Sequence, residues 1–334
     1  MSSRQLHWIL AGIGVLLLAM LAACARHTDH QQTHENAGQP VRFGIISAPV
    51  TLDPRFATDA TSSRINRLIY QRLVDFDDNN LPKPGITLWQ KLSNTHYRFI
   101  LKSDNRFHHG KLLTSRDIKA TYDYILDKSN GSPQRTALRH IKQIKIVDVR
   151  TLDFILERPD PLFPAFLVVG IMPEDLILAG HAFNSQPVGS GRFRFVKWPY
   201  ADELVLQRIG DQQLFEFIKV KDPTVRVLKL LRGEIDLLQN NLPPEHISYL
   251  RKQTSILSAA RKGANYSYLG FNLMDEQTRQ PQLRKAIAHA LDRDNIIHYA
   301  LGDAADKASG FFPASHWAGA KITPYDFDPV SYTH

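Results

Sequence analysis

The segment 97–118 reads YRFILKSDNRFHHGKLLTSRDI and joins three signals within a short span. Its first residues alternate apolar and polar side chains, as a half-buried strand does, with Tyr97, Phe99 and Leu101 on the apolar face. His109-Gly110 predicts a turn. Thr114-Ser115-Arg116-Asp117 then combines the hydroxyl and the acid of a capping box, so a helix is expected from Ser115 onward. Its apolar face is expected to contain Ile118, Tyr122, Ile125 and Leu126.

The rest of the chain alternates short strand-like and helix-like segments, which predicts a mixed α/β fold. Strands are expected at 41–46, 144–149, 152–156, 193–196 and 235–237, and further helices at 62–73, 223–232, 283–291 and 293–301. Asp222 and Asp292 stand where N-caps are needed, and Gly233 stands where a helix should end. Residues 310–334 lose this periodicity and are expected to form loops.

Composition favours a large folded core and argues against a nucleic-acid partner. The 334 residues are 43% hydrophobic and hold 41 Lys and Arg against 33 Asp and Glu. Only Arg4 among these lies within residues 1–23, so the remainder has 40 cations against 33 anions, a net charge of +7. These charges are spread along the chain without long runs of one sign, which is typical of a basic solvated surface.

The single cysteine, Cys24, follows a short apolar run and marks an export signal. The charged start, the apolar stretch and Leu21-Ala22-Ala23-Cys24 resemble the lipobox of bacterial lipoproteins, in which the cysteine is lipidated and becomes the mature N-terminus. A permanent transmembrane helix is the alternative, but roughly 15 apolar residues span only about 22 Å of a core about 30 Å thick. Residues 24–40 are then expected to form a polar tether.

Two motifs could suggest chemistry, and each has a simpler interpretation. Gly189-Ser190-Gly191 lacks the third glycine and the following helix of a nucleotide loop, so a tight turn is favoured. His108 and His109 are adjacent and would point to opposite faces, and no further ligand completes a metal shell nearby in the sequence. The sequence therefore predicts no catalytic residue, no metal and no cofactor.

Several segments in the correct order resemble the family 5 bacterial extracellular solute-binding proteins, the peptide-binding components of ABC importers. The resemblance covers most of residues 41–317. It is carried by Thr51-Leu52-Asp53-Pro54, Ile69-Tyr70-Gln71-Arg72-Leu73-Val74, the segment 97–118, Pro187-Val188-Gly189-Ser190-Gly191-Arg192-Phe193, Leu231-Arg232-Gly233-Glu234-Ile235-Asp236, Gly270-Phe271-Asn272 and the stretch 283–293. His109, Ser190 and Arg192 depart from the residues that are usual at these places in the family.

The resemblance implies a periplasmic-binding-protein type II-like fold with mixed sheets and flanking helices. Residues 1–23 are expected to be the lipoprotein signal peptide, 24–40 the tether, 41–265 the first lobe and 266–334 the beginning of the second lobe. The family usually continues for another domain's length, on the order of 150 residues. The first lobe is thus expected to be largely complete and the second only begun.

The resemblance also implies a binding site and partners. In this family an extended ligand lies between two lobes and is held through its main chain. The spacing after Leu52-Asp53-Pro54 places the first-lobe edge at Thr58, Asp59 and Ala60. The expected ligand is a peptide or similar small solute, and the expected partner is an ABC permease. The chain is expected to be a monomer outside the inner membrane, anchored through Cys24, with no nucleic acid.

Two other functions remain open from the sequence. A truncated relative could bind nothing and act as a scaffold lipoprotein. An exported lipoprotein hydrolase would need a nucleophile and a base that converge in one cleft, and no motif marks such a pair.

Overall fold

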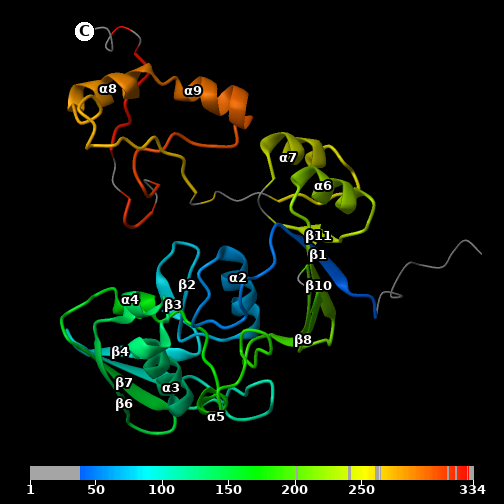
Figure 1. Cartoon of the computed structure of the whole chain (residues 1–334), viewed down its shortest axis with the longest axis vertical. Helices are drawn as coiled ribbons and strands as arrows, with labels where there is room; N and C mark the ends of the chain where they lie inside the picture. The colour runs from blue at the N-terminus through cyan, green and yellow to red at the C-terminus, as the bar shows by residue number, and fades with distance from the viewer. Residues whose placement is uncertain are drawn as a thin grey trace, which may run out of the picture. The chain divides into compact units, whose positions relative to one another are not determined.

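The computed structural model describes residues 38–200, 202–239, 242–259, 263, 265–313, 316–319, 322–328 and 330, and Figure 1 shows its helices and strands. The predicted signal peptide, Cys24 and nearly all of the tether lie outside these residues. Within them, no helix is both long enough and apolar enough to cross a membrane.

A four-stranded antiparallel sheet is built around the segment 97–118. Its order is β4-β5-β7-β6, with β4 at Thr87–Ser93, β5 at His96–Leu101, β6 at Ile141–Ile146 and β7 at Thr151–Leu156. The helix α3, Ser115–Leu126, packs on β6 and β7, as Figure 1 shows. Buried side chains of these elements, including Phe99, Ile118, Tyr122 and Phe154, form one hydrophobic core.

A second sheet has five strands and is mixed. Its order is β11-β1-β10-β9-β8, with β1 at Val41–Ile45, β8 at Phe193–Tyr200, β9 at Glu203–Arg208, β10 at Leu214–Lys219 and β11 at Leu237–Leu238. β1 runs parallel to both of its neighbours, so the chain crosses over between distant segments to build this sheet. The helix α2, Ala60–Ile69, contributes Ile65 and Ile69 to a second core with β9 and β10.

Short elements connect these sheets and continue the chain. They are β2 at Val74–Phe76, β3 at Pro82–Pro84, 3-10 turns at Lys128–Asn130 and Phe163–Phe166, α4 at Arg135–Leu138, α5 at Glu174–Leu178, α6 at Pro223–Leu231 and α7 at Pro244–Arg251. The later described residues contain α8 at Pro281–Ala290, α9 at Arg293–Asn295 and a π-helical turn at Ile296–Ala300.

The predicted helix starts are confirmed at the level of single hydrogen bonds. Thr114 and Asp117 form the capping box of α3, in which the Thr114 backbone N–H donates to Asp117 at 2.8 Å. Asp222 accepts from the Val225 N–H at 2.9 Å ahead of α6, and Asp292 accepts from the Asn295 N–H at 2.9 Å ahead of α9. The described residues of 310–334 contain neither helix nor strand, as the loss of periodicity predicts.

The predicted helix 62–73 is shifted, because the chain leaves it four residues early. α2 ends at Ile69, and Tyr70 is extended with φ −116° and ψ 141°. The Ile69 carbonyl accepts from the Gly191 N–H at 2.7 Å, so a distant segment satisfies a group that one more helical turn would have used. Leu73 then enters the core of the four-stranded sheet instead of the core beneath α2.

Two predicted strands are also displaced. The strand expected at 144–149 runs from Ile141 to Ile146, because the Val147 N–H donates to the Thr151 carbonyl at 2.9 Å and closes a hairpin there. The strand expected at 235–237 begins only at Leu237, since the Ile235 N–H is still bonded to the Lys229 carbonyl of α6.

Candidate functional site

The predicted ligand-binding residues Thr58, Asp59 and Ala60 lie at the N-terminal end of α2. Thr58 and Ala60 are exposed and Asp59 is partly buried. The Asp59 side chain accepts from the Ser62 N–H at 2.8 Å, so it is the N-cap of the helix. Asp59 therefore has a structural function as the N-cap of α2, which the sequence analysis did not predict.

The N–H and carbonyl groups of Thr58 are available for hydrogen bonding. Among the described residues, neither its N–H nor its carbonyl has a hydrogen-bonding partner. The Ala60 N–H, at the first position of α2, is likewise one of the donors that a helix leaves free. Exposed donors and acceptors in one short segment are what an extended peptide needs in order to bind through its own main chain.

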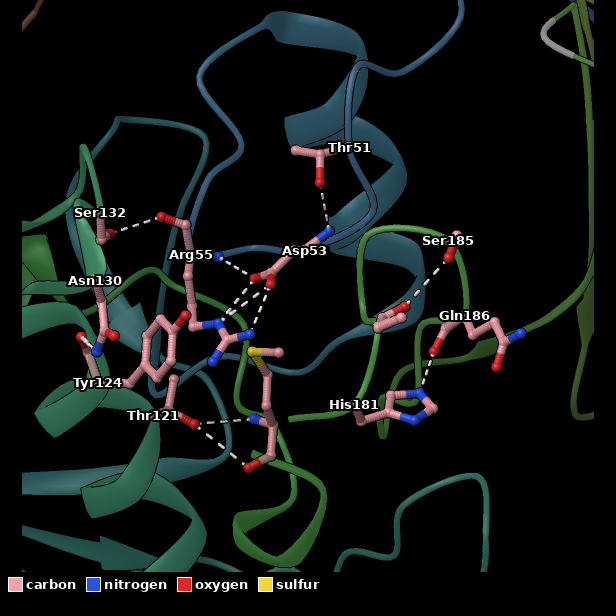
Figure 2. A network of polar contacts seen from close by, with 12 residues as sticks. Thr51, Asp53, Arg55, Thr121, Tyr124, Asn130, Ser132, His181, Ser185 and Gln186 are labelled. Carbon is pink, nitrogen blue, oxygen red and sulfur yellow. Dashed lines mark hydrogen bonds and ion pairs between the residues drawn. The ribbon is translucent and has the colours of Figure 1, made fainter. Parts of the chain in front are cut away.

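A buried ion pair anchors this open segment from the preceding residues. The Arg55 guanidinium donates through Nε and Nη2 to the Asp53 carboxylate, with the shortest contact at 2.7 Å, and Figure 2 shows both side chains. The Arg55 backbone N–H donates to the same carboxylate at 2.9 Å. Both side chains are only 6% exposed. A doubly bonded pair of this kind fixes the direction of the chain as it approaches Thr58.

Side chains from more distant elements hold the same segment in place. The Arg55 guanidinium carbon lies 3.7 Å from the centre of the Tyr124 ring of α3, beside which it is drawn in Figure 2. Ser132 donates to the Arg55 carbonyl at 2.7 Å, and Gln134 donates to the Ala57 carbonyl at 2.8 Å. Hydrogen bonds therefore hold Arg55 and Ala57 in place, whereas the Thr58 main chain that follows them is unpaired among the described residues.

The buried hydroxyl of Tyr70 lies close enough to the ion pair to interact electrostatically with both Asp53 and Arg55. Burial raises the pKa of Tyr70 well above its ordinary value, and the nearby Asp53 carboxylate raises it further. The phenol is therefore neutral in the folded protein. Sequence analysis named Asp53 only as part of a family motif and missed Arg55. The available signal was an acid and a cation two residues apart on either side of a proline.

The two glycines of Gly189-Ser190-Gly191 do not form the expected tight turn. Neither has a positive φ angle. A Cβ on Gly189 would lie 2.0 Å from the Ile69 carbonyl oxygen, and one on Gly191 would lie 2.3 Å from the Leu68 carbonyl oxygen. The glycines are required because this segment passes directly over the end of α2. The strand predicted after them is present as β8.

His108 joins this glycine segment to the turn at 107–110. The turn is confirmed, with Gly110 at φ +93°. The His108 backbone N–H donates to the Gly189 carbonyl at 2.8 Å, and its ring Nε2 lies 3.0 Å from the Gly191 carbonyl. Burial lowers the pKa of His108, so the neutral ring donates from Nε2. His109 points elsewhere, with its Nε2 4.0 Å from Asp175.

The described residues offer little for metal or catalytic chemistry. No group of three or more His, Cys, Asp or Glu side chains within them could hold a metal ion. An open hollow of ≈ 520 Å³ lies along α3 and α5. The charges around it pair with one another, Arg116 with Glu174 at 2.9 Å and Lys119 with Asp123 at 2.6 Å.

The chain belongs to the family described as "Bacterial extracellular solute-binding proteins, family 5 Middle", which matches residues 82–331. The resemblance seen in the sequence is thus confirmed. Among curated relatives, the oligopeptide-binding protein AppA of Bacillus subtilis is 23% identical over 326 residues, covering 90% of this chain and 60% of AppA. The glutathione-binding protein GsiB of Pectobacterium atrosepticum is 24% identical and is likewise covered to 60%.

Solved structures confirm the fold. The substrate-binding protein CtaP of Listeria monocytogenes superimposes with a TM-score of 0.80 at 25% identity, over 88% of this chain and 64% of CtaP. The fold class predicted from the sequence, a mixed α/β protein of the periplasmic-binding-protein type II kind, is therefore confirmed. The chain spans about 60% of the length of the curated relatives it matches.

Proposed function

We propose that this chain is the substrate-binding component of an ABC importer. It would capture peptides or a similar small solute outside the inner membrane and deliver them to a permease. The observation that carries the proposal is the open main-chain edge at Thr58–Ala60, held by the Asp53–Arg55 pair, in a member of this family. A rigid edge that binds main chain can accept ligands with varied side chains.

The names of the relatives support a peptide ligand. AppA is named as an oligopeptide-binding protein and GsiB as a glutathione-binding protein, and both ligands contain amide bonds. An extended ligand of this kind can pair with Thr58, Asp59 and Ala60. No reaction is assigned to the chain, since its relatives are named as binding proteins.

The domain boundaries and the location also belong to this proposal. Residues 41–265 would form the first lobe and 266–334 the beginning of the second, behind a signal peptide at 1–23 and a tether at 24–40. Lipidation at Cys24 would hold the protein at a membrane as a monomer. Cys24→Ser should release it into the soluble fraction, whereas an uncleaved, unmodified N-terminus in mass spectra from the native host would contradict the lipid anchor.

Residues 41–334 by themselves should bind peptides weakly. An edge that is exposed on one side leaves water competing for the ligand's main chain and charged ends. The affinity of this segment should therefore lie well below that of a relative with two complete lobes.

A proline substitution tests the edge without disturbing the helix. Ala60 is the first residue of α2, where proline is well tolerated, and Asp59 is already extended at φ −87° and ψ 156°, as a residue before proline prefers. Ala60→Pro removes one N–H donor, and Ala60→Ser retains it. Tripeptide added at millimolar concentration should shift amide NMR signals of residues 57–62 in the parent and in Ala60→Ser, but less in Ala60→Pro.

A second measurement tests the affinity. Calorimetry with di- to pentapeptides should give tighter binding for a chimaera that extends the chain with the C-terminal part of AppA than for the chain itself. Equally tight binding by both, or NMR shifts that are unaffected by Ala60→Pro, would contradict the proposal.

A further inference from the structure

Two arginines at one end of the β6–β7 pair converge on a single imidazole. Arg139 directly follows α4, Arg158 follows β7, and both are exposed. The Arg158 Nη2 lies 2.7 Å from the His140 Nε2, and the Arg139 Nε donates to the same nitrogen at 3.4 Å. A guanidinium can only donate, so Nε2 is the acceptor of both bonds. These three residues are called the arginine–histidine cluster.

The cluster differs from the other arginine contacts of the protein. Four arginines that are exposed or partly exposed each hold a carboxylate through two nitrogen donors. They are Arg42 with Asp236, Arg98 with Asp153, Arg116 with Glu174 and Arg208 with Asp211. Among the described residues, neither Arg139 nor Arg158 forms an ion pair with a carboxylate. Their two guanidiniums share one neutral acceptor instead, which leaves most of their donors unused.

The acids nearest in sequence do not neutralise the cluster. The Asp160 carboxylate accepts from the Leu162 N–H at 2.9 Å. Glu157 is exposed, and its backbone N–H donates to the His140 carbonyl at 2.9 Å, but within the described part of the chain its carboxylate forms no ion pair. The positive charge of the two guanidiniums therefore stays open to an anion from solution.

The surrounding segment adds further positive charge. Residues 128–147 contain five Lys or Arg and no Asp or Glu. Two of these cations, Lys142 and Lys145, are exposed on β6, and the described residues hold no ion-pair partner for either. Lys142 stands only two residues after His140, at the irregularity between Ile141 and Gln143. Cations gathered in this way create a positive potential that attracts anions.

The number of donors favours a phosphate group over a carboxylate. One guanidinium fork satisfies the two oxygens of a carboxylate, as in the four pairs above. Two forks with a lysine beside them offer more donors than a carboxylate can accept, whereas a phosphate presents several oxygens in a tetrahedral arrangement. Such an anion would replace the His140 Nε2 as the acceptor for both guanidiniums.

We propose that the arginine–histidine cluster, with Lys142, binds a phosphate group. Two sources have this chemistry, a free phosphate or phosphate monoester and the phosphodiester headgroup of a phospholipid. The proposal rests on the hydrogen bonds and charges of the cluster, and it does not depend on peptide binding.

An NMR titration of the full chain tests the site. Inorganic phosphate and glycerophosphoglycerol, which is the soluble headgroup of phosphatidylglycerol, are added separately, with sodium chloride and sodium acetate at the same ionic strength as controls. Amide signals of residues 139–142 and 157–158 should shift and saturate with at least one of the two phosphates. Arg158→Gln should weaken this binding by about fivefold or more, and Arg158→Lys, which retains the charge but loses the fork, should weaken it less.

The matched control is Arg116→Gln, which removes an exposed arginine that is already paired with Glu174. It should leave phosphate binding unchanged. Unshifted signals far from the substitution show that each variant is folded.

The ligand arms distinguish the two sources of phosphate. Saturable shifts with glycerophosphoglycerol would assign a lipid headgroup, and shifts with inorganic phosphate alone would assign a free phosphate or monoester. Equal shifts with chloride or acetate, no saturable shift with either phosphate, or equal losses in Arg158→Gln and Arg116→Gln would overturn the proposal. Since no peptide is present, these results would leave the proposed function standing, and a failure of peptide binding would leave the phosphate result unaffected.

Discussion

Residues 41–250 and residues 251–330 are built from the same kinds of local signal, yet within the part of the chain that the structure describes only the first region has a core. Both contain helices with acidic N-caps, Asp222 ahead of α6 and Asp292 ahead of α9. In the first region two hydrophobic clusters are formed by buried residues from Leu52 to Phe217, whereas none of the described residues of the second region is buried. Capping therefore determines where a helix begins, but not whether it has anything to pack against.

The energetic consequence is a molecule of unequal stability. Burial of apolar surface contributes roughly 25 cal/mol per Å² and is the dominant favourable term in folding, while a cap contributes only about 1 kcal/mol. The first region should unfold cooperatively. The second should open locally at low cost, because few apolar contacts resist it.

Truncation of one apolar side chain in each region gives the largest expected difference. Phe154 is fully buried, with its ring 5.3 Å from that of Phe99 and 5.5 Å from that of Tyr122. Phe154→Ala should lower the free energy of unfolding by about 3 to 5 kcal/mol. Ile287→Ala in α8 should change it by less than about 0.5 kcal/mol. Urea titration followed by tryptophan fluorescence measures both, and similar losses would remove the distinction.

Removal of one partner of the buried ion pair is the next largest change. Asp53→Ala leaves the Arg55 guanidinium buried without its carboxylate, which should cost about 3 kcal/mol. Asp303→Ala, which removes the exposed partner of His298 in the second region, should cost almost nothing. Should Asp53→Ala unfold at the same urea concentration as the parent, the pair would not anchor the segment before Thr58.

The helix cap of α3 should have a smaller effect. Asp117 accepts from the Thr114 N–H and also from the Glu174 N–H at 2.8 Å, so it ties α5 to α3. Asp117→Ala should destabilise the protein by about 0.5 to 2 kcal/mol. Asp123→Ala, on the exposed side of the same helix, is the control and should stay within about 0.5 kcal/mol. Equal denaturation midpoints for Asp117→Ala and the parent would show that the cap contributes nothing.

The smallest expected effect is a pH dependence from His108. Burial lowers the pKa of His108, so the folded state favours the neutral ring. Its contribution is fully present above the ordinary pKa of about 6.5 and is lost as the pH falls below it, at up to about 1.4 kcal/mol per pH unit. His108→Gln should flatten the decline in stability between pH 7 and pH 5. An unchanged slope in His108→Gln would contradict this assignment.

Local signals were sufficient to predict most elements, but not the contacts made between distant segments. The alternation at Tyr97–Leu101 and the capping box at Thr114 depend on neighbouring residues, and both are confirmed. The end of α2 was misplaced, because it depends on the N–H of Gly191 more than a hundred residues away. The same limit applies to the site. The spacing after Pro54 predicts Thr58–Ala60 as the binding segment, and this stays a prediction. The contact of the Asp53–Arg55 pair with Tyr124 could not be predicted, because it depends on how α3 packs against this segment.

Hydrogen exchange of the full chain, followed peptide by peptide with mass spectrometry, tests the central comparison most directly. Amides of β5 and β7 should exchange only through global unfolding, whereas those of α8 should exchange orders of magnitude faster. Equal protection of α8 and β5 in the chain alone would show that residues 251–330 share in a common core, and it would contradict the account.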